Sequence, residues 1–492
     1  MIGHSIGILS MGLGAVVATP LLLLIFFPEE SVHTMSFFTP ALIAIIGGFL
    51  LWYGFRKRKH PALTAADASL IVILIWLIAI VLGALPFFLS GILPLLDSLF
   101  ESTSGWTTTG LTMLALPQEI PSIFLFWRAL IQFVGGAGII VIMSSVLIKP
   151  SGASAYEMES QSDRFLPHVI RTARITTGIY LGYSIIGVIL YYLAGMNFFD
   201  AICHTMSAIS TGGFSTQSES IGYWQSVPME AVSVMLMLVG ATSFATHYVI
   251  IRSRGRMGFR DNEIILMKWL LVISIPLIAF GLIRTFDIRA LDGIRYGVFH
   301  AATALTGCGF STLSVGDMSD KTLFLFIILM LIGGGVGSTA GGMRLYRVSI
   351  IIKSIGRWGR KQFYSSSTVV SRLIWKRGKQ VEILDTEIQA VTSFIGLYII
   401  IYLVGVFIFL SYGFTLSESL FELASALSLV GLSTGITGTG MPAGSKIALI
   451  AGMFLGRLGF IVIIRVFARA RKDLRVKRGR PNPRSPIPDP CE

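Results

Sequence analysis

The apolar positions of this chain form long unbroken stretches, and most polar positions lie between those stretches. Apolar runs long enough to cross a bilayer as helices recur from the first residues to about position 470. They do not show the alternation of apolar and polar residues that marks the strands of a transmembrane barrel. A helix satisfies its backbone hydrogen bonds internally, as lipid demands. The pattern therefore predicts an all-α polytopic membrane protein.

The apolar runs divide into two leading helices and four units of similar layout. We expect two additional N-terminal transmembrane helices within residues 1–60. Each unit then has an apolar helix, a segment too short to span, and a second apolar helix. The units are expected at 61–150, 165–256, 260–356 and 383–470. Segments too short to span are re-entrant, and re-entrant backbone must be buried in protein or line water.

The second helix of each unit is expected to be a long apolar span, broken only in the third unit. These four spans are predicted at about 122–148, 228–252, 322–353 and 443–470. The first apolar run of the chain lacks a basic leader, so we expect it to be retained as a helix.

A short pattern, Gly-(Leu or Phe)-(Ser or Thr), occurs once in each unit after the short segment. The four copies, called here the first to fourth glycine segments, are TTTGLT at 107–112, TGGFST at 211–216, GCGFST at 307–312 and LVGLST at 429–434. A glycine lets bare backbone carbonyls face a common axis, because no Cβ blocks them. One copy alone would indicate only a turn that ends a helix. Four copies in register predict a pseudo-fourfold pore lined by carbonyl oxygens, the arrangement that replaces water around a permeating ion.

The candidate selectivity filter takes three residues from each glycine segment. They are Thr108, Thr109, Gly110, Thr211, Gly212, Gly213, Gly307, Cys308, Gly309, Val430, Gly431 and Leu432. Hydroxyl groups such as those of Thr109, Thr211 and Ser433 are expected to assist the carbonyls. Each short helix would point its partly negative C-terminal end at the axis, which favours a cation.

A glycine-rich stretch, GGGVGSTAGGMR at 333–344, interrupts the second helix of the third unit. Each glycine costs roughly 1 kcal/mol relative to alanine in a helix, so the stretch predicts a break at membrane depth. We expect a flexible gate there, formed by Gly333, Gly334, Gly335, Gly337, Gly341 and Gly342. The alternative is close helix packing through small residues. No Gly-Lys-(Ser/Thr) follows, so a nucleotide site is not expected.

Arg457 lies inside the last apolar run, and intramembrane charges are costly and usually functional. We expect it to belong to the gate or to set a barrier to cations. The alternative is a structural pairing with carbonyl groups or with Glu422. Arg128, near the start of its apolar run, is interpreted as an interfacial anchor.

Several other polar residues near the short segments have two interpretations. Asp97, Asp200 and Glu418 could attract cations to the pore entrance or could cap helix starts, where carboxylates are favoured. His204 and His300 are expected to be packed or hydrogen-bonded behind the pore, because no third ligand stands at metal-site spacing.

Composition and charge place the chain relative to a membrane. Hydrophobic residues make up 53% of the 492 positions and charged residues 13%, with a mean hydropathy of +0.76, which excludes a soluble protein. The net charge of +13 comes from basic clusters outside the apolar runs, at 56–60, 252–256, 344–379 and 465–480. The last two overlap an expected basic linker at 357–382 and an expected basic, Pro-rich tail at 471–492. This bias predicts cytoplasmic N- and C-termini, a cytoplasmic linker and tail, and glycine segments that open outward. The basic surface is expected to meet membrane lipid and not nucleic acid.

Enzyme function is not expected. The chain shows no nucleophile elbow, zinc signature or paired carboxylates in a polar loop. A lipid-modifying membrane enzyme would need an acidic metal-binding cluster at the membrane face. A purely sensory or scaffolding protein would leave four re-entrant segments unexplained.

Together these motifs resemble the Trk/Ktr/HKT superfamily of potassium uptake systems, most closely pore-forming subunits of the bacterial TrkH type. The resemblance rests on the four glycine segments and on WRALIQFVGGAGIIV, FSTQSESIGYW, GGGVGSTAGGMR and GRLGF. It implies potassium bound at the filter, with Gly110 marking the potassium-selective form. It also implies that the glycine-rich stretch and Arg457 form the gate. Many relatives carry Gly-Arg-Leu-Glu where this chain has Gly459 in the acidic position, so a role for that acid is absent here.

The resemblance further implies a homodimer in the bacterial cytoplasmic (inner) membrane, with one pore in each protomer. A cytosolic ring of TrkA-type regulatory subunits is expected to bind nucleotide, whereas this chain needs no organic cofactor. The expected function is potassium uptake through a selective, gated, channel-like pore. A sodium- or proton-coupled potassium symporter is the alternative.

Overall fold

The computed structural model describes residues 2–56, 64–138, 169–255, 260–363, 373–376, 378–460, 462–464, 466 and 471. Helices make up most of these ranges. One antiparallel hairpin, β1 (Leu373–Lys376) and β2 (Lys379–Glu382), pairs Leu373 with Glu382. The expected tail at 471–492, apart from its first residue, lies outside the described residues, as do parts of the expected linker and of the first two units.

Within the described ranges, six helical stretches are long and apolar enough to cross a membrane, and one bent helix pair is a seventh candidate. The six are Ile2–Ile25, Pro28–Phe55, Ala66–Leu89, Ala173–Leu193, Asn262–Phe286 and Asp385–Ser411. Large apolar side chains such as Leu50, Phe280 and Phe407 are more than half exposed, as contact with lipid requires. The predicted all-α, multi-pass membrane class is confirmed.

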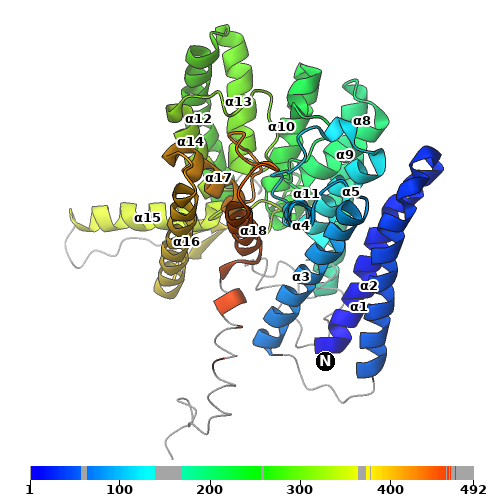
Figure 1. Cartoon of the computed structure of the whole chain (residues 1–492). Coiled ribbons are helices and arrows are strands. Elements are labelled where there is room, and N and C mark those ends of the chain that lie inside the picture. Colours follow the sequence, from blue (N-terminus) through cyan, green and yellow to red (C-terminus); the bar gives the residue numbers. More distant parts are fainter. Residues whose placement is uncertain are drawn as a thin grey trace, which may run out of the picture.

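The leading helices α1 (Ile2–Ala18) and α2 (Thr34–Phe55) pack together at one edge of the molecule, beside α3 (Ala65–Leu89) (Figure 1). Glycine permits this close crossing. A Cβ on Gly7 would lie 2.6 Å from the carbonyl oxygen of Gly48. Small residues bring membrane helices together in this way because lipid supplies no hydrophobic driving force between them.

Each unit begins with a long helix and a shorter buried helix. The long helices are α3 (Ala65–Leu89), α8 (Val169–Leu193), α12 (Asn262–Phe286) and α16 (Asp385–Ser411). The four short helices are α4 (Leu95–Trp106), α9 (Phe198–Ile209), α13 (Ala290–Thr306) and α17 (Leu416–Ser428). Side chains cap the starts of some of them; for example, the Thr415 hydroxyl and the Glu418 carboxylate form a reciprocal capping box on α17.

In the described residues, the second helix of every unit departs from a continuous α-helix, whereas only the third was expected to do so. The pieces are α5 (Ser122–Phe133) with a π-helical turn at Val134–Gly138, α10 (Val227–Ala241) with α11 (Phe244–Arg252), α14 (Asp320–Ile332) with α15 (Leu345–Lys361), and α18 (Ala443–Leu458). The second pair bends by 100°, and α18 ends before Gly459, whose φ is +74°. The expected continuous helices over 228–252 and 443–470 are therefore wrong.

The interruptions occur where a short helix ends against the second helix. In three units a Cβ on a glycine of the second helix would collide with the carbonyl oxygen four residues before the segment glycine. The pairs are Gly135 with Trp106, Gly240 with Ile209, and Gly456 with Leu427. These glycines therefore let the second helices approach the short-helix ends closely. In the third unit, α15 runs across the direction of α16 (Figure 1).

Candidate functional site

The four glycine segments meet in a closed ring. A Cβ on each segment glycine would collide with a backbone carbonyl oxygen of the next segment. The glycine of the fourth segment contacts the first segment in the same way, which closes the ring. The contacts run from Gly110 to Gly212, from Gly213 to Cys308, from Gly309 to Val430, and from Gly431 to Thr109. Each carbonyl belongs to the residue immediately before the neighbouring segment's glycine. The ring therefore requires glycine at all four places.

Every glycine segment leaves its short helix by the same backbone path. The residue two positions before the segment glycine is left-handed, with φ of +59° at Thr108, +52° at Thr211, +69° at Gly307 and +60° at Leu429. Residues other than glycine rarely adopt this conformation, and such strain concentrates at functional sites. The following residue donates its N–H to the carbonyl five positions earlier, at 2.8, 2.8, 3.2 and 2.9 Å in the four units. The units are therefore equivalent in backbone as well as in sequence.

A side chain nine positions before each segment glycine holds the outgoing end of that segment. The hydrogen-bonded pairs are Glu101 with Thr112 at 2.9 Å, His204 with Ser215 at 2.9 Å, His300 with Thr312 at 3.2 Å, and Glu422 with Ser433 at 2.7 Å. The expectation that the two histidines are hydrogen-bonded is confirmed, and each bonds to the glycine segment of its own unit. Each bond ties the segment to its own short helix, so the ring is supported from behind in all four units.

Arg128 is not an interfacial anchor. Its side chain is 2% exposed, and its Nε donates to the Glu101 carboxylate at 2.7 Å. Its Nη1 donates to the Ser215 carbonyl oxygen at 2.9 Å, and its guanidinium lies 4.1 Å from the ring centre of Phe214. Arg128 therefore links the first glycine segment to the second. The sequence shows Arg128 as a single charge near the start of an apolar run, which does not indicate a partner in the second segment.

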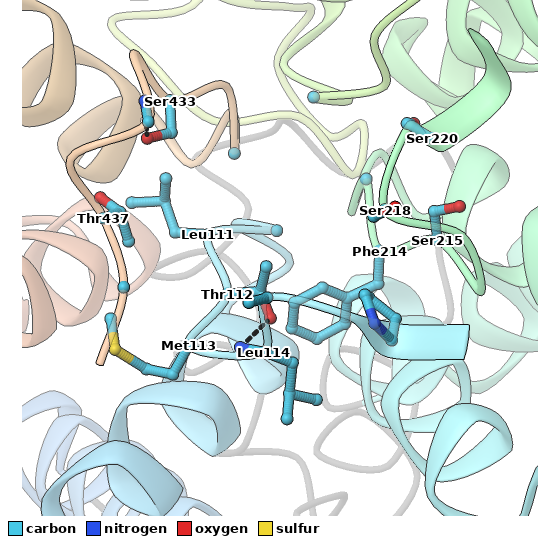
Figure 2. Close-up of a pocket in the computed structure, with 18 of the residues that line it drawn as sticks. Leu111, Thr112, Met113, Leu114, Phe214, Ser215, Ser218, Ser220, Ser433 and Thr437 are labelled. Carbon is cyan, nitrogen blue, oxygen red and sulfur yellow. Dashed lines mark hydrogen bonds between the residues drawn. The ribbon is translucent and has the colours of Figure 1, made fainter. Parts of the chain in front are cut away.

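A cavity of about 630 Å³, the vestibule cavity, lies on one side of the ring. All four segment glycines line it, and Figure 2 shows Leu111, Phe214 and Ser433 of three different segments around the same space. Hydroxyl groups and backbone supply its polar lining, and the described lining residues include no acidic side chain. The cavity gives a hydrated ion room beside the glycine ring.

The three acidic residues considered for the entrance lie elsewhere. Asp97 is buried and accepts from Lys446 Nζ at 2.5 Å. Asp200 accepts from the Thr216 hydroxyl at 2.6 Å, near the start of its short helix. Glu418 belongs to the capping box of α17. Pairing and capping account for all three, so the structure favours that interpretation over attraction of cations in the cavity.

The glycine-rich stretch forms a loop between α14 and α15, called here the glycine loop (333–344). Its ends close on each other, because Leu345 N–H donates to the Gly334 carbonyl at 2.9 Å and a Cβ on Gly333 would collide with the Gly341 carbonyl. A Cβ on Gly341 would in turn collide with the carbonyl of Ser428, at the end of α17. The loop therefore packs tightly against the fourth unit.

The glycine loop is also bonded to the second unit. Gly335 N–H donates to the Ala241 carbonyl at 2.8 Å, where α10 ends. The Thr339 hydroxyl donates to the Gly240 carbonyl at 2.9 Å and accepts from the Thr211 hydroxyl at 3.2 Å. Thr211 belongs to the second glycine segment but does not line the vestibule cavity. The loop thus touches the ring at the end away from that cavity.

Arg457 connects the glycine loop with the first unit. Its Nη1 donates to the Thr339 carbonyl at 3.1 Å and lies 3.4 Å from the Thr108 hydroxyl. Its Nη2 donates to the carbonyl oxygens of Gly135 and Gly136, the latter at 3.0 Å. The side chain is 7% exposed. One buried guanidinium therefore joins the loop, the π-helical turn and the first glycine segment.

A structural role for Arg457 could come from pairing with carbonyl groups or with Glu422. The structure shows the pairing with carbonyl groups. The Glu422 carboxylate instead accepts from hydroxyls of its own unit, including Thr437 at 2.7 Å. Two residues after Arg457, the chain turns at Gly459 with φ of +74°. A glycine at that position suits the turn, because a side chain there would be strained.

Two polar side chains at the site were not among the expected residues. Glu263, at the start of α12, accepts from Val336 N–H of the glycine loop at 2.9 Å. Gln132, in α5, contacts the second glycine segment. The sequence signal for Gln132 is a single polar residue inside an apolar run, close to a pair of glycines. The signal for Glu263 is no more than an acid near a helix start.

Comparison with known proteins agrees with this arrangement. The sequence profile of the TrkH family, described as a cation transport protein, matches residues 33–283 and 265–473. An uncharacterized cation transporter of Methanocaldococcus jannaschii is 33% identical over 469 residues, covering 94% of each chain. The Trk system potassium uptake protein TrkH of Halomonas elongata is 30% identical over 485 residues, covering 96% of this chain and 98% of that protein.

A solved structure of a TrkH protein has the same fold as this chain. The crystal structure of the potassium transporter TrkH from Vibrio parahaemolyticus superposes with a TM-score of 0.82 at 26% identity. The alignment covers 96% of this chain and 97% of that chain. The likeness therefore extends over the whole architecture, from the leading helices to the fourth unit.

Proposed function

The chain belongs to the TrkH family of cation transport proteins, a family of transporters and not of enzymes, and we propose that it takes up potassium ions through the glycine ring. The relatives named as potassium uptake proteins match nearly their whole length to this chain, which supports potassium as the cargo. The observation that carries the proposal is the closed contact of four segment glycines with four neighbouring carbonyls. Such a ring offers a dehydrated cation oxygen ligands from four directions.

Gating is the second part of the proposal. The glycine loop lies against the second and fourth units at the end of the ring away from the vestibule cavity, and Arg457 is bonded to it. A positive charge at that place opposes a cation leaving the ring. An ion passes when the loop and the arginine move aside, so transport is channel-like and follows the electrochemical gradient.

The proposal includes a setting for the pore. The protein forms a homodimer in the bacterial inner membrane, with both termini and the basic linker in the cytoplasm and the vestibule cavity facing outward. A TrkA-type ring of nucleotide-binding subunits acts on the cytoplasmic side. The positive-inside distribution of basic residues supports the orientation. The names of the relatives, which refer to a Trk system, support a multi-component assembly.

The test is rubidium uptake into liposomes that contain the purified protein, competed with external potassium and then with sodium. Competition by potassium and not by sodium is expected. Equal competition by both ions would overturn the potassium selectivity. If uptake is absent, the measurement is repeated with the regulatory ring and nucleotide present.

The same liposomes distinguish a channel from coupled symport. Rubidium flux through a channel is set by its own gradient and the voltage. We therefore expect no change when a sodium or proton gradient is imposed at a clamped voltage. Flux that reverses with the sodium or proton gradient would replace the channel with the symporter.

A further inference from the structure

The side chain of Gln132 belongs to the first unit but is hydrogen-bonded to the backbone of the second glycine segment. It is completely buried in α5. Its Nε2 donates to the Gly212 carbonyl oxygen at 2.6 Å, and its Oε1 accepts from Phe214 N–H at 3.2 Å and from the Ser207 hydroxyl at 2.8 Å. The Gly212 carbonyl is the same oxygen that a Cβ on Gly110 would strike. Gln132 therefore bonds directly to one of the four carbonyls in the ring.

These partners fix the orientation of the amide group. The backbone N–H of Phe214 can only donate, and the carbonyl of Gly212 can only accept. One side chain must supply an acceptor and a donor on neighbouring atoms, and the primary amide of glutamine does so. A carboxylate of the same size could keep the bonds from Phe214 and Ser207 but could not donate to Gly212.

The other segments are held by different groups. In the first and fourth segments, the glycine N–H donates to a serine six positions earlier, from Gly110 to Ser104 and from Gly431 to Ser425, both at 3.0 Å. The equivalent serine of the second unit is Ser207, and its hydroxyl is turned to Gln132 instead. At this place the second segment is therefore held by a side chain of another unit, whereas the first and fourth are held by a serine of their own short helices.

Gln132 also differs from its counterparts in the other units. It lies three positions before Gly135, where the second helix of the first unit is interrupted. Three positions before its counterparts Gly240 and Gly456, and before Gly333 where α14 ends, the residues are all methionine and all completely buried: Met237, Met453 and Met330. The fold thus accepts methionine at this place three times, and the first unit alone has a hydrogen-bonding side chain there.

We propose that Gln132 is a positioning residue that sets the discrimination between potassium and sodium by fixing the Gly212 carbonyl. Its bond restrains the direction of that oxygen and prevents the second segment from moving inward around a smaller ion. Selection between these two ions depends on the size of the carbonyl cavity and on the number and strength of its dipoles. By holding the Gly212 carbonyl, Gln132 affects the size of the cavity and the strength of one carbonyl dipole in one of the four segments. The inference rests on the proposed function, since it concerns selectivity in the same ring.

The decisive variant is Gln132→Met, which gives the first unit the residue that the other three carry. We expect rubidium uptake to persist while the ratio of the sodium to the potassium inhibition constant falls about tenfold. Gln132→Glu keeps the size of the side chain; when ionised it removes the donor to Gly212 and adds a negative charge, and it should lower the same ratio. Measuring both variants keeps the test valid if one of them does not fold.

Two control variants separate positioning from packing. Met453→Leu changes the equivalent buried residue of the fourth unit with nearly conserved volume, and its selectivity should match the parent. Ser207→Ala removes the hydroxyl bond to Gln132 but leaves both bonds to the segment backbone, and it should also retain selectivity. Thermal unfolding of each variant in detergent reports any loss of packing.

The outcomes are distinct. Parent selectivity in folded Gln132→Met and Gln132→Glu would overturn the inference, even if rubidium flux or thermal stability fell, because it would leave Gln132 a purely structural role. An unselective parent would contradict the proposed function instead. A fall in the inhibition ratio confined to the Gln132 variants would support the inference.

Discussion

The Nη1 atom of Arg457 lies 3.1 Å from the carbonyl oxygen of Thr339, so the arginine at the end of α18 is bonded directly to the glycine loop. The two residues belong to different units, separated by 118 positions. The Thr339 hydroxyl in turn bonds to the second unit, at Gly240. A change at either residue therefore affects the contact between loop and ring, which makes the pair a direct test of the gate.

Arg457→Ala should raise rubidium flux. The substitution removes the donor to Thr339 and to the carbonyls of Gly135 and Gly136, and it removes the positive charge beside the ring. A shift of about 1.4 kcal/mol toward the open loop would give a tenfold increase. The measurement is initial rubidium uptake per protein. Arg289→Ala is the control, because that side chain is 88% exposed. Equal flux in both variants and in the parent would contradict a gating role.

Deletion within residues 335–341 should raise flux more strongly than Arg457→Ala. It removes the obstruction itself, including Gly335 and its bond to Ala241. Thr339→Val tests the same loop with less disturbance, because it keeps the shape and loses the hydroxyl bonds to Gly240 and Thr211. Adding Arg457→Ala to the deletion should raise flux little further, since both changes act on one contact. A fully additive effect on flux would mean that the arginine and the loop act independently.

Gly110→Ser should weaken the selection of potassium over sodium. Gly110 has φ of +96°, and a Cβ there would collide with the Gly212 carbonyl. The ring must therefore deform at that oxygen. We expect the sodium-to-potassium inhibition ratio for rubidium uptake to fall by about tenfold, or about 1.4 kcal/mol.

Gly435→Ser is the matched control for that variant. Gly435 has a similar φ of +97°, but apart from its two chain neighbours no residue has an atom within 4 Å of the place that its Cβ would occupy, so the variant bears the backbone strain without the collision. Its selectivity should equal that of the parent. The same loss of selectivity in both variants would point to backbone strain alone and count against the ring.

Glu101→Gln should destabilise the fold strongly. It leaves the buried Arg128 guanidinium without its charged partner, and breaking a buried ion pair typically costs about 3–5 kcal/mol. Asp292→Asn breaks the Arg289 ion pair, whose arginine is exposed, and should cost less than about 1 kcal/mol. Thermal unfolding in detergent compares the two. Similar melting temperatures would show that the pair between Glu101 and Arg128 adds little to stability.

The sequence determined the membrane class and the identity of the site elements, because both depend on local properties. An apolar run such as 385–411 must be helical in lipid whatever lies beside it. The four segment glycines and the glycine loop were recognisable because glycine is conformationally permissive and a poor helix former. The histidines behind the ring were also anticipated to be packed or hydrogen-bonded, since no third ligand stands at metal-site spacing.

The tertiary structure alone decided which groups meet. Lys446 bonds to Asp97 across 349 positions, and Arg128 and Gln132 reach a segment of the neighbouring unit. Residue type gives no sign of such partners, because the partner of a buried polar group depends on how distant helices pack. The end of α18 at Leu458, inside an apolar run that continues beyond it, was also not predicted from the sequence. The order of apolar residues and glycines along the chain determines where it is helical and where its backbone can turn. Packing among the four units determines which carbonyl each segment glycine faces and which side chains hold that carbonyl in place.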